Sequence, residues 1–541
     1  MKTQVNLFLS LFLCLPLFSL SQLTNSDLQE LEELNWQNLN WKEDKILGAS
    51  VELAYEEILK NKISKKTIIV AVLDNGIDIQ HEDLKNKIWI NEDEIPGNQI
   101  DDDNNGFIDD IYGWNFLGNS QGQNIGKENL EMTRVYREYL AKIENGELDS
   151  NSYDGPKAEI YNKAKKLYRE EWNKRNRYLK NNNEAINIVG SAKELIKELY
   201  GVDVKNIKDL SDVNPAENRQ VMRAKSILFN VYDQGLSLED FQNSKEQNEK
   251  YTLQYLNLDL NAREIIGDNP YDINDKNYGN SDVRGPFADH GTACAGLIAA
   301  ERNNGIGING VADNVKIMCL RTTPSGDERD KDVALAIRYA VDNGAHIINM
   351  SFGKELSPEK EFVDEAIKYA EEKGVLIVHS AGNSANDLRE IPAFPNEIYL
   401  DGKQATNMIT VGATSHKPNN RMMAVFSNYG GGIVDILGPG VDIVSLDTGN
   451  TYSSHSGTSF SGPMVSGVAA VIWSYYPELS VEELIRIMVE SSKSKKPKKV
   501  YPPNQSGEKM KKVKIEEICG NGGVVNLYKA LEMLASQEEE T

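Results

Sequence analysis

The sequence predicts an α/β fold in which a mostly parallel β-sheet is covered by helices, and two observations support this prediction. First, short runs made almost entirely of apolar residues recur along the chain, as expected of strands buried on both faces. They occupy residues 67–73, 315–320, 346–350, 375–379 and 408–411. Second, helical patterns separate these runs, with apolar residues three or four positions apart, as in residues 332–343 and 361–373. Strands that alternate with helices are typical of a parallel sheet with helices on both sides.

The length and charge of the chain limit the kinds of protein it can be. Its 541 residues are enough for one large domain and an accessory region, because domains usually hold about 100 to 250 residues. The 59 Lys and Arg against 82 Asp and Glu give a formal charge of −23, which repels nucleic-acid phosphates and anionic lipids. We therefore expect no nucleic-acid partner. An acidic surface is compatible with bound divalent cations and equally with a solvated exterior, and the oligomeric state is not indicated.

The N-terminus has the pattern of a signal peptide. Lys2 is followed by an apolar run at residues 7–20, which is too short to span a bilayer comfortably. The small residues Ser19 and Ser21 are typical of a cleavage site, which places Gln22 at the start of the mature chain. We therefore expect a secreted or periplasmic protein. No later segment reaches the roughly 18 consecutive apolar residues of a membrane-spanning helix, so no transmembrane anchor is expected.

Residues 119–270 differ in character from the rest of the chain. They are rich in Lys, Glu, Asn and Tyr, contain no apolar strand runs, and show long helical patterns such as 157–179 and 191–200. Apolar side chains such as those of Tyr168 and Trp172 favour a folded region over a disordered one. We therefore predict a helical insertion.

Three polar residues stand close to glycines at positions suited to catalysis. Asp74 ends the first buried strand, and the carboxyl ends of parallel strands are where such sheets place their sites. His290 opens an alanine-rich helix and is a candidate general base. Ser459 lies in a small-residue turn before the apolar helix 465–475, whose N-terminus favours developing negative charge. Each residue also has a simpler explanation, as a helix cap or a structural histidine.

Taken together, these residues and their neighbours resemble the subtilase family. The motifs are V-L-D-N-G-I-D at residues 72–78, D-H-G-T at 289–292 and S-G-T-S-F-S-G-P at 456–463, in the chain order Asp, His, Ser. The resemblance covers roughly residues 64–118 and 271–536. It implies a subtilisin-like three-layer fold, with a large helical insertion between the Asp and His motifs.

The resemblance implies a role for each residue in a secreted serine endopeptidase that works through an acyl-enzyme. Ser459 is the nucleophile, His290 is the general base and then the general acid, and Asp74 orients the histidine. Asn383, in the sequence S-A-G-N at 380–383, completes an oxyanion hole with the backbone N–H of Ser459. The residue order argues against a lipase-type hydrolase. A binding module that has lost its activity is the other alternative, and the presence of all four residues argues against it.

The resemblance also implies substrate-binding residues. The sequence N-M-S-F-G at 349–353 matches the strand that pairs with an extended substrate, and backbone pairing of this kind recognises polypeptide. The expected substrates are therefore proteins or peptides. The residues implied are Ser351, Phe352 and Gly353 on this strand and Ser380, Ala381 and Gly382 along the primary pocket. Acidic residues near the expected cleft indicate either a basic substrate or a solvated helix start; they are Asp327, Glu328, Asp330 and Asp332.

The chain departs from the family pattern near the histidine and the serine. Ala293 and Cys294 follow the D-H-G-T motif, where a histidine and a valine are usual. Phe460 and Ser461 stand where Met-Ala is common. None of these differences removes a catalytic group. Cys294 is interpreted either as a buried thiol or as a site of sensitivity to mercurials.

Two groups of oxygen-bearing residues predict structural calcium. The loop at residues 99–110 has carboxylate and amide side chains at alternating positions but lacks the bidentate Glu of an EF-hand, so an acidic turn without metal is the alternative. Its candidate ligands are Asp101, Asp103, Asn105 and Asp109. The resemblance implies a second site, whose ligands are the side chains of Asp83 and Asn304 and the carbonyl groups of Ile306 and Ile308.

These predictions divide the chain into consecutive segments. They are a signal peptide (1–21), an N-terminal extension (22–62), the first part of a peptidase domain (63–118), the helical insertion (119–270), the second part of the peptidase domain (271–536) and an acidic tail (537–541). Residues 22–62 look too short for the usual inhibitory prodomain of the family. One hypothesis is that this extension or the insertion controls activation or substrate access. The other is that the insertion only elaborates the surface.

Overall fold

The computed structural model describes residues 35–148, 155, 157–493, 497–507, 510–520 and 523–540. The predicted signal peptide, residues 1–21, lies outside these ranges, as does the start of the N-terminal extension up to residue 34. The chain divides into two compact units. The first runs to Lys127 and resumes at Ala262, and the second comprises Glu128–Asn261. Within the described ranges, no helix combines the length and the apolar character needed to cross a membrane.

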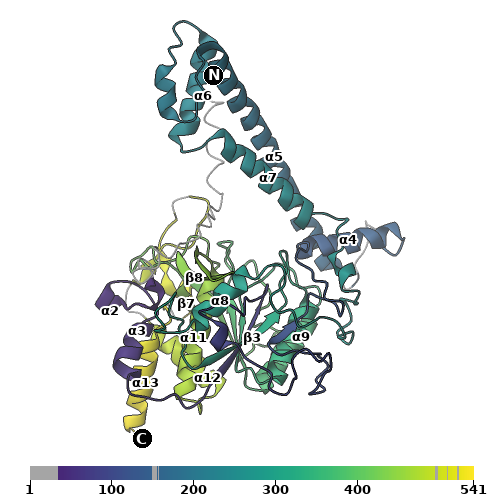
Figure 1. Ribbon diagram of the computed structural model, residues 1–541, viewed down its shortest axis with the longest axis vertical. Coiled ribbons are helices and arrows are strands. Elements are labelled where there is room, and N and C mark those ends of the chain that lie inside the picture. The colour runs from purple at the N-terminus through teal and green to yellow at the C-terminus, as the bar shows by residue number, and fades with distance from the viewer. Residues whose placement is uncertain are drawn as a thin grey trace. The chain divides into compact units, whose positions relative to one another are not determined.

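A seven-stranded sheet forms the centre of the first unit (Figure 1). Its strands are β1 (Ile68–Asp74), β2 (Gly113–Asn115), β3 (Val315–Arg321), β4 (Ile347–Met350), β5 (Leu376–Ser380), β6 (Met408–Thr414) and β7 (Ile436–Pro439). They lie in the order β2-β3-β1-β4-β5-β6-β7, and every neighbouring pair is parallel. All five predicted apolar runs form strands. The sequence does not predict β2 and β7, which are short edge strands without a long apolar run.

Helices cover both faces of this sheet, which gives three layers (Figure 1). Neighbouring residues of a strand point to opposite faces, so Val70 and Val72 pack in one hydrophobic core and Ala71 and Leu73 in another. The first core also contains α8 (Asp289–Ala299), α11 (Thr458–Tyr475), α12 (Val481–Ser492) and α13 (Leu527–Glu540). The second contains α9 (Asp330–Asp342) and α10 (Lys360–Glu372). The predicted α/β fold is confirmed.

The register of the sheet brings the ends of its central strands together. β1 ends at Asp74, and the pairs Leu73–Met350 and Met350–His379 continue the register across β4 and β5. Ser351, which follows β4, therefore lies at the same edge of the sheet as Asp74. This carboxyl edge is where parallel sheets place their binding sites.

Two antiparallel ribbons stand apart from the sheet. One is the hairpin of β8 (Ile443–Asp447) and β9 (Thr451–His455), and the other pairs β10 (Lys499–Val500) with β11 (Val513–Lys514). The sequence predicts neither ribbon, because these strands are short and carry polar residues on one or both faces. The seven-stranded sheet is therefore entirely parallel, whereas the strands of these two ribbons are antiparallel.

The described part of the N-terminal extension is packed into the first unit. The side chains of Trp36, Val51 and Leu59 join the same core as Leu531 of α13. This part of the extension therefore contributes to the core of the unit. Its elements and the remaining single turns of the unit are η1 (Trp36–Asn38), α2 (Trp41–Asp44), α3 (Val51–Leu53), η2 (Ala54–Leu59), η3 (Lys85–Lys87), η5 (Ala262–Ile265) and η6 (Ile515–Glu517).

The second unit is helical. Its elements are α4 (Glu131–Glu144), α5 (Ala158–Tyr200), η4 (Ile207–Asp212), α6 (Arg219–Asp233) and α7 (Leu238–Tyr255). The sequence predicts helical stretches such as 157–179 and 191–200, and α5 includes both in one continuous helix of 43 residues. It is continuous because both halves have packing partners. The rings of Tyr161 and Tyr168 contact tyrosine rings of α4 at a tilt, and the half that contains the buried Val189 packs against α6.

Candidate active site

The candidate site begins where β1 ends and α8 starts. Asp74 is buried, and its two carboxylate oxygens lie 2.8 and 3.0 Å from Nδ1 of His290. A carboxylate only accepts, so Nδ1 carries the proton and Nε2 keeps its lone pair. Asn75 holds the two elements together, because its side chain accepts from the N–H of Gly291 at 3.0 Å and donates to Asp289 at 2.9 Å.

Gly291 allows α8 to approach β1 this closely. A Cβ atom at this position would lie 2.2 Å from the carbonyl O of Gly76 and 3.0 Å from Cβ of Asp74. A larger residue would push the helix, and His290 with it, away from the carboxylate. The glycine after the histidine is therefore a packing requirement of the Asp74–His290 contact.

Burial and the Asp74 carboxylate act in opposite directions on His290. Burial alone lowers the pKa of the imidazole, but the negative charge at Nδ1 outweighs it and raises this pKa well above its usual value. The side chain is still 33% exposed, so a substrate can reach it. His290 is therefore a stronger base than a free histidine, provided that the pH is high enough to deprotonate it.

Ser459 is the second residue of α11, which starts earlier than the predicted helix 465–475. Its Oγ donates to the carbonyl O of Ser351 at 3.1 Å, and Oγ of Ser351 donates back to the carbonyl O of Ser459 at 2.8 Å. In the described part of the chain no hydrogen bond joins Oγ of Ser459 to His290. Rotation about χ1 brings the hydroxyl away from Ser351, and catalytic hydrogen bonds of this kind often form only with substrate bound.

The contacts of Asn383 fix the orientation of its side-chain amide. Oδ1 accepts from the backbone N–H and from Oγ1 of Thr458, at 2.8 and 3.0 Å. The Nδ2 group is then the donor left to face the cavity that Asn383 shares with Ser459. The backbone of Asn383 is held as well, because its carbonyl O accepts from Nε2 of Gln505 at 2.8 Å. Gln505 comes from the loop between β10 and β11, and no motif connects it with the site.

The predicted substrate-binding residues line two adjoining cavities. One, of about 240 Å³, is lined by Ser459 and Asn383 together with Ser351, Phe352, Gly353, Ser380 and Gly382. The other, of about 100 Å³, shares Gly353, Ser380, Gly382 and Asn383 with it and adds Ala381. Five of the six residues therefore line the cavity that contains the nucleophile and Asn383, and Ala381 lines the adjoining cavity with Asn383.

Only two of the four acidic residues near the start of α9 reach this cleft. Asp327 and Glu328 line the larger cavity, and burial raises the pKa of Glu328 to about 8. Asp330 is buried 2.9 Å from Nζ of Lys354. Asp332 is buried in an ion pair with Arg263. The last two residues are therefore neither a solvated helix start nor part of the cleft.

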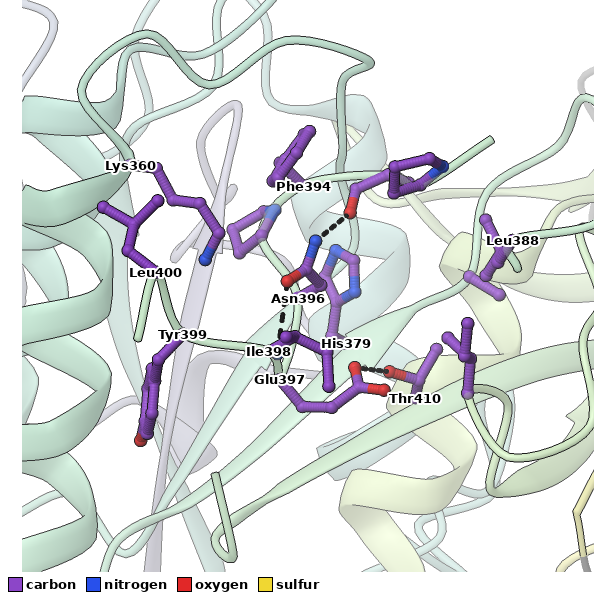
Figure 2. A pocket seen from close by; sticks show the side chains of 15 residues that line it. Lys360, His379, Leu388, Phe394, Asn396, Glu397, Ile398, Tyr399, Leu400 and Thr410 are labelled. Atoms are coloured by element: carbon purple, nitrogen blue, oxygen red, sulfur yellow. Dashed lines mark hydrogen bonds between the residues drawn. The ribbon is translucent and has the colours of Figure 1, made fainter. Parts of the chain in front are cut away.

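A third cavity, of about 440 Å³, adjoins the substrate-binding wall (Figure 2). It shares Ala381 with the cleft, but none of the predicted catalytic residues lines it. The imidazole of His379 stands in its lining, and Nε2 lies 2.9 Å from the carbonyl O of Phe352. Burial lowers the pKa of His379 to about 4. The neutral imidazole thus contacts the predicted substrate-binding strand at the carbonyl O of Phe352.

The four residues of the second predicted calcium site lie around Asp83, but Ile306 and Ile308 contact Asn304 and Asp83 through their N–H groups and not through the predicted carbonyl groups. Oδ1 of this buried carboxylate accepts from Nδ2 of Asn304 at 2.6 Å, and Oδ2 accepts from the N–H of Ile308 at 3.1 Å. Oδ1 of Asn304 accepts from the N–H of Ile306 at 3.0 Å. Burial raises the pKa of Asp83 to about 7. The side-chain oxygen atoms of Asp83 and Asn304 are of the type that calcium binds.

The loop at 99–110 gathers only part of its predicted ligands. The carboxylates of Asp101 and Asp103 lie within 4.8 Å of one another and of Glu94, and Asn105 donates to Asp103 at 3.0 Å. Asp109 points elsewhere, because its carboxylate accepts the N–H groups of residues 97–99. Sequence reasoning misses Glu94, which precedes the alternating pattern and is positioned by accepting backbone N–H groups of the loop.

The sequence of the chain is similar to those of known proteins. The model of the subtilase family matches residues 65–522. The chain is similar to a thermophilic serine proteinase of Bacillus sp. (strain AK1), with 39% identity over 219 residues, which cover 40% of this chain and 49% of that protein. It is also similar to the alkaline elastase YaB of Bacillus sp. (strain YaB), with 40% identity over 192 residues, 35% of this chain and 46% of that protein.

The chain spans about half the length of these curated relatives. Among solved structures it is similar to a chain from a study of the assembly of the subtilase cytotoxin SubAB. The TM-score is 0.38 at 26% identity, and the match covers 46% of this chain and 77% of that chain.

Proposed function

The chain belongs to the subtilase family, and from that premise we propose that it is a serine endopeptidase that cleaves proteins or peptides through an acyl-enzyme. The observation that supports this most is the hydrogen bond that Nδ1 of His290 donates to Asp74, at 2.8 Å, in a unit where Ser459 and Asn383 line one cavity. The same observation disfavours a binding module without activity, since such a module has no need of a correctly oriented base.

The proposed reaction begins when Oγ of Ser459 turns from Ser351 toward His290 and attacks the substrate carbonyl. His290 takes the hydroxyl proton at Nε2 and later donates it to the leaving amine, while Asp74 stabilises the imidazolium and fixes its tautomer. Water then hydrolyses the acyl-enzyme by the same proton transfers in reverse order. Each proton transfer uses the lone pair of Nε2 of His290. This lone pair is available because the contact with Asp74 keeps the ring proton on Nδ1.

The oxyanion is stabilised by two donors, Nδ2 of Asn383 and the backbone N–H of Ser459. The first donor is oriented by Thr458, and the second lies at the positive N-terminal end of α11. One such donor is worth roughly 3 to 4 kcal/mol, a magnitude known from subtilisin itself. The substrate backbone is proposed to pair with Ser351–Gly353, with Ser380–Gly382 along the primary pocket.

We propose two structural calcium sites. Asp83, Asn304, Ile306 and Ile308 would hold one ion, which would link the segment after β1 to the loop after α8. Asp101, Asp103 and Asn105, with Glu94 in place of Asp109, would hold the other. Calcium supplies charge neutralisation at buried carboxylates, and the proposed reaction uses no metal.

We also propose export of the protein, on the sequence pattern of residues 1–21 and the family of the chain. The helical region assigned to residues 119–270 is proposed to be an insertion into the peptidase domain. Residues 119–127 and 262–270 at its two ends belong by their contacts to the first unit. The separate helical body is then Glu128–Asn261.

Labelling with a fluorescent fluorophosphonate tests the proposed activity directly. The wild-type chain is expected to react at Ser459, with the Ser459→Ala variant as an unreactive control of the same fold. His290→Ala is expected to lose most of the labelling rate, because the hydroxyl is then without its base. A folded wild-type protein that neither labels nor cleaves casein would refute the proposal.

A further inference from the structure

We propose that Lys354 fixes the distance between two segments that line the larger substrate cavity, and that it thereby positions substrates with a long acyl part. The inference rests on the proposed function, because it takes Ser351–Gly353 as the strand that pairs with the substrate. Lys354 is the next residue along the chain. It acts through the segments that it joins, so it is a positioning residue and not a catalytic one.

The two segments come from different parts of the fold. One is the loop at 326–328, which lies between β3 and α9, and the other is Ser351–Gly353, which follows β4. Both line the cavity that contains Ser459 and Asn383. An extended acyl part that pairs with Ser351–Gly353 fills space that the loop also lines. The spacing of the two segments therefore decides how closely the substrate fits.

The side chain of Lys354 connects these segments directly. Its Nζ donates to the carbonyl O of Glu328 at 2.8 Å and lies 2.9 Å from Oδ1 of Asp330. Glu328 belongs to the loop that lines the cavity, and Asp330 is the first residue of α9. Lys354 itself continues the strand at Gly353. One ammonium group thus joins one side of the cavity to the other.

The burial of this ion pair needs an explanation. The side chain of Lys354 is 1% exposed and that of Asp330 is 4% exposed. Lysine is almost never buried this completely unless it is paired, because its ammonium loses hydration. Well-packed apolar residues in place of a buried ion pair often give equal or greater stability. Stability alone therefore does not account for a lysine here, whereas a required geometry does.

The backbone of Lys354 is held in place on the opposite side. Its N–H donates to the carbonyl O of Phe394 at 3.0 Å, and its carbonyl O accepts from the N–H of Phe394 at 2.9 Å. Phe394 follows Ala393, which lines the smaller cavity together with Lys354. Because the main chain is fixed at this point, the length of the lysine side chain sets the position of the Glu328 carbonyl.

The carboxylate of Asp330 has two further donors from the segment after Lys354. Its Oδ1 accepts from Oγ of Ser357 at 2.9 Å, and its Oδ2 accepts from the N–H of Glu359 at 2.8 Å. These two bonds hold the start of α9 even without the lysine. Loss of the ammonium should therefore release the loop at 326–328 and leave α9 in place.

The length of the acyl part decides which substrates depend on Lys354. A substrate with one residue before the cleaved bond uses Ser459, Asn383 and the primary pocket. A substrate with four such residues also runs along Ser351–Gly353, opposite the loop at 326–328. Interactions of this kind are made in the ground state and in the transition state alike, so their loss appears mainly in KM.

The test compares two thiobenzyl esters with the same residue before the cleaved bond. One has this residue alone, acetylated, and the other has three more residues before it. Lys354→Met keeps an unbranched side chain and removes the ammonium. It is expected to lower kcat/KM for the long ester by roughly tenfold, as for the loss of a hydrogen bond from a charged group, mainly through KM. The rate for the short ester should change less than twofold.

Two further variants separate the spacing of the cleft from the stability of the fold. Asp332→Asn alters the other buried ion pair at the start of α9, outside the cleft, and should lower the melting temperature without changing the ratio of the two rates. The double variant Lys354→Met with Asp330→Asn removes both charges and should melt higher than Lys354→Met alone. Its selective loss on the long ester should persist, because the bond to the carbonyl O of Glu328 is still missing.

The outcomes distinguish this inference from the proposed function. Equal losses on both esters, no loss on the long ester, or a double variant with the wild-type ratio would overturn the inference and leave the proposed function intact. The double variant also provides the answer if Lys354→Met alone does not fold. A wild-type protein that cleaves neither ester and fails to label would instead refute the proposed function, and this inference with it.

Discussion

The thiol of Cys294 lies 3.9 Å from Nδ1 of His290, one turn further along α8, and it also donates to the carbonyl O of Ser459 at 3.4 Å. One buried side chain therefore contacts the residues that bear both the base and the nucleophile. Burial raises the pKa of this thiol, so it is neutral at neutral pH. A neutral thiol packs like a small apolar group and is a poor nucleophile.

Alkylation should therefore leave the activity intact. Iodoacetamide at pH 7.5 is expected to cause no loss of peptidase rate over an hour, because it reacts with thiolate and the Sγ atom is inaccessible. The measurement is residual kcat/KM, with mass spectrometry to show whether Cys294 is modified. Rapid inactivation that is absent in Cys294→Ala would show that the thiol is reactive.

As the pH is lowered, the activity should be lost at a higher pH than it would be with a histidine of ordinary pKa as the base. The Asp74 carboxylate raises the pKa of His290, and only the neutral imidazole can take the proton of Ser459. As the pH falls through that raised pKa, the base is protonated and kcat/KM is lost. Asp74→Asn should move this limb to lower pH and reduce kcat by roughly 10⁴-fold. An unshifted limb in this variant would contradict the assignment.

Removal of the oxyanion donor should affect the rate and leave binding unchanged. Asn383→Ala is expected to lower kcat by roughly 10²- to 10³-fold with little change in KM, because the donor acts on charge that develops only in the transition state. Asn383→Asp retains the shape and the bonds from Thr458 but has no donor. It should be as defective as the alanine variant, and a near-normal rate in either variant would exclude this role.

Calcium removal should lower the melting temperature, and more so at high pH. Asp83 must be ionised to bind the ion, and without a cation burial raises its pKa to about 7. The raised pKa means that the calcium-free protein loses stability as the pH rises from about 4 to 7, and calcium offsets this loss. Scanning calorimetry with and without EDTA, at pH 5.5 and pH 8, measures the difference.

Two variants assign the calcium effect to its sites. Asp83→Asn should remove the pH-dependent part of the EDTA effect, and Asp101→Asn should remove the remainder. Identical melting curves with and without EDTA at both pH values would contradict both sites.

The buried ion network at the start of α9 should be important for stability. Arg263 pairs with Asp332 at 2.7 Å and with Asp268, and Lys331 pairs with Asp268 at 2.6 Å. All four side chains are at most 4% exposed. Asp332→Asn leaves one positive charge in excess and should cost about 3 to 5 kcal/mol of unfolding free energy.

The exposed pair of Glu365 and Lys368 provides the matched control. Glu365→Gln removes a surface ion pair of 2.9 Å and should change the unfolding free energy by less than about 1 kcal/mol. The network also predicts a pH effect, because Arg263 and Lys331 outweigh burial and lower the pKa of Asp268. This contribution is present above the unfolded pKa of about 3.9 and is lost below it. Equal effects of the two variants would contradict the prediction.

The sequence predicts the core of the sheet well because burial on both faces leaves a clear apolar run. β1, β3 and β6 are recognisable in this way, and the motifs around Asp74, His290 and Ser459 are short and contiguous. The proposed triad is visible in sequence because each member has a local signature. The distances between its members in the folded chain depend on the strand register.

Residues that act through distant contacts have no such signature. Gln505 reaches the carbonyl of Asn383 from 122 positions away, and Glu94 joins the acidic loop from outside its pattern. Asp332 looks like a solvated helix start because its partner Arg263 is 69 positions earlier.

The long separation of Asp74 from His290 has a consequence for how the chain folds. β1 pairs with β3 across the whole helical unit, since Ile68 lies beside Val315, and such non-local pairings form slowly. The helical unit ties its own ends together, because the N–H of Leu130 donates to the carbonyl O of Tyr255. Once its local helices have formed, it acts as a short bridge between the two halves of the sheet. The entropy of closing the β1–β3 loop is then that of residues 75–129 and 256–314, which lie outside this bridge, rather than that of the whole separation.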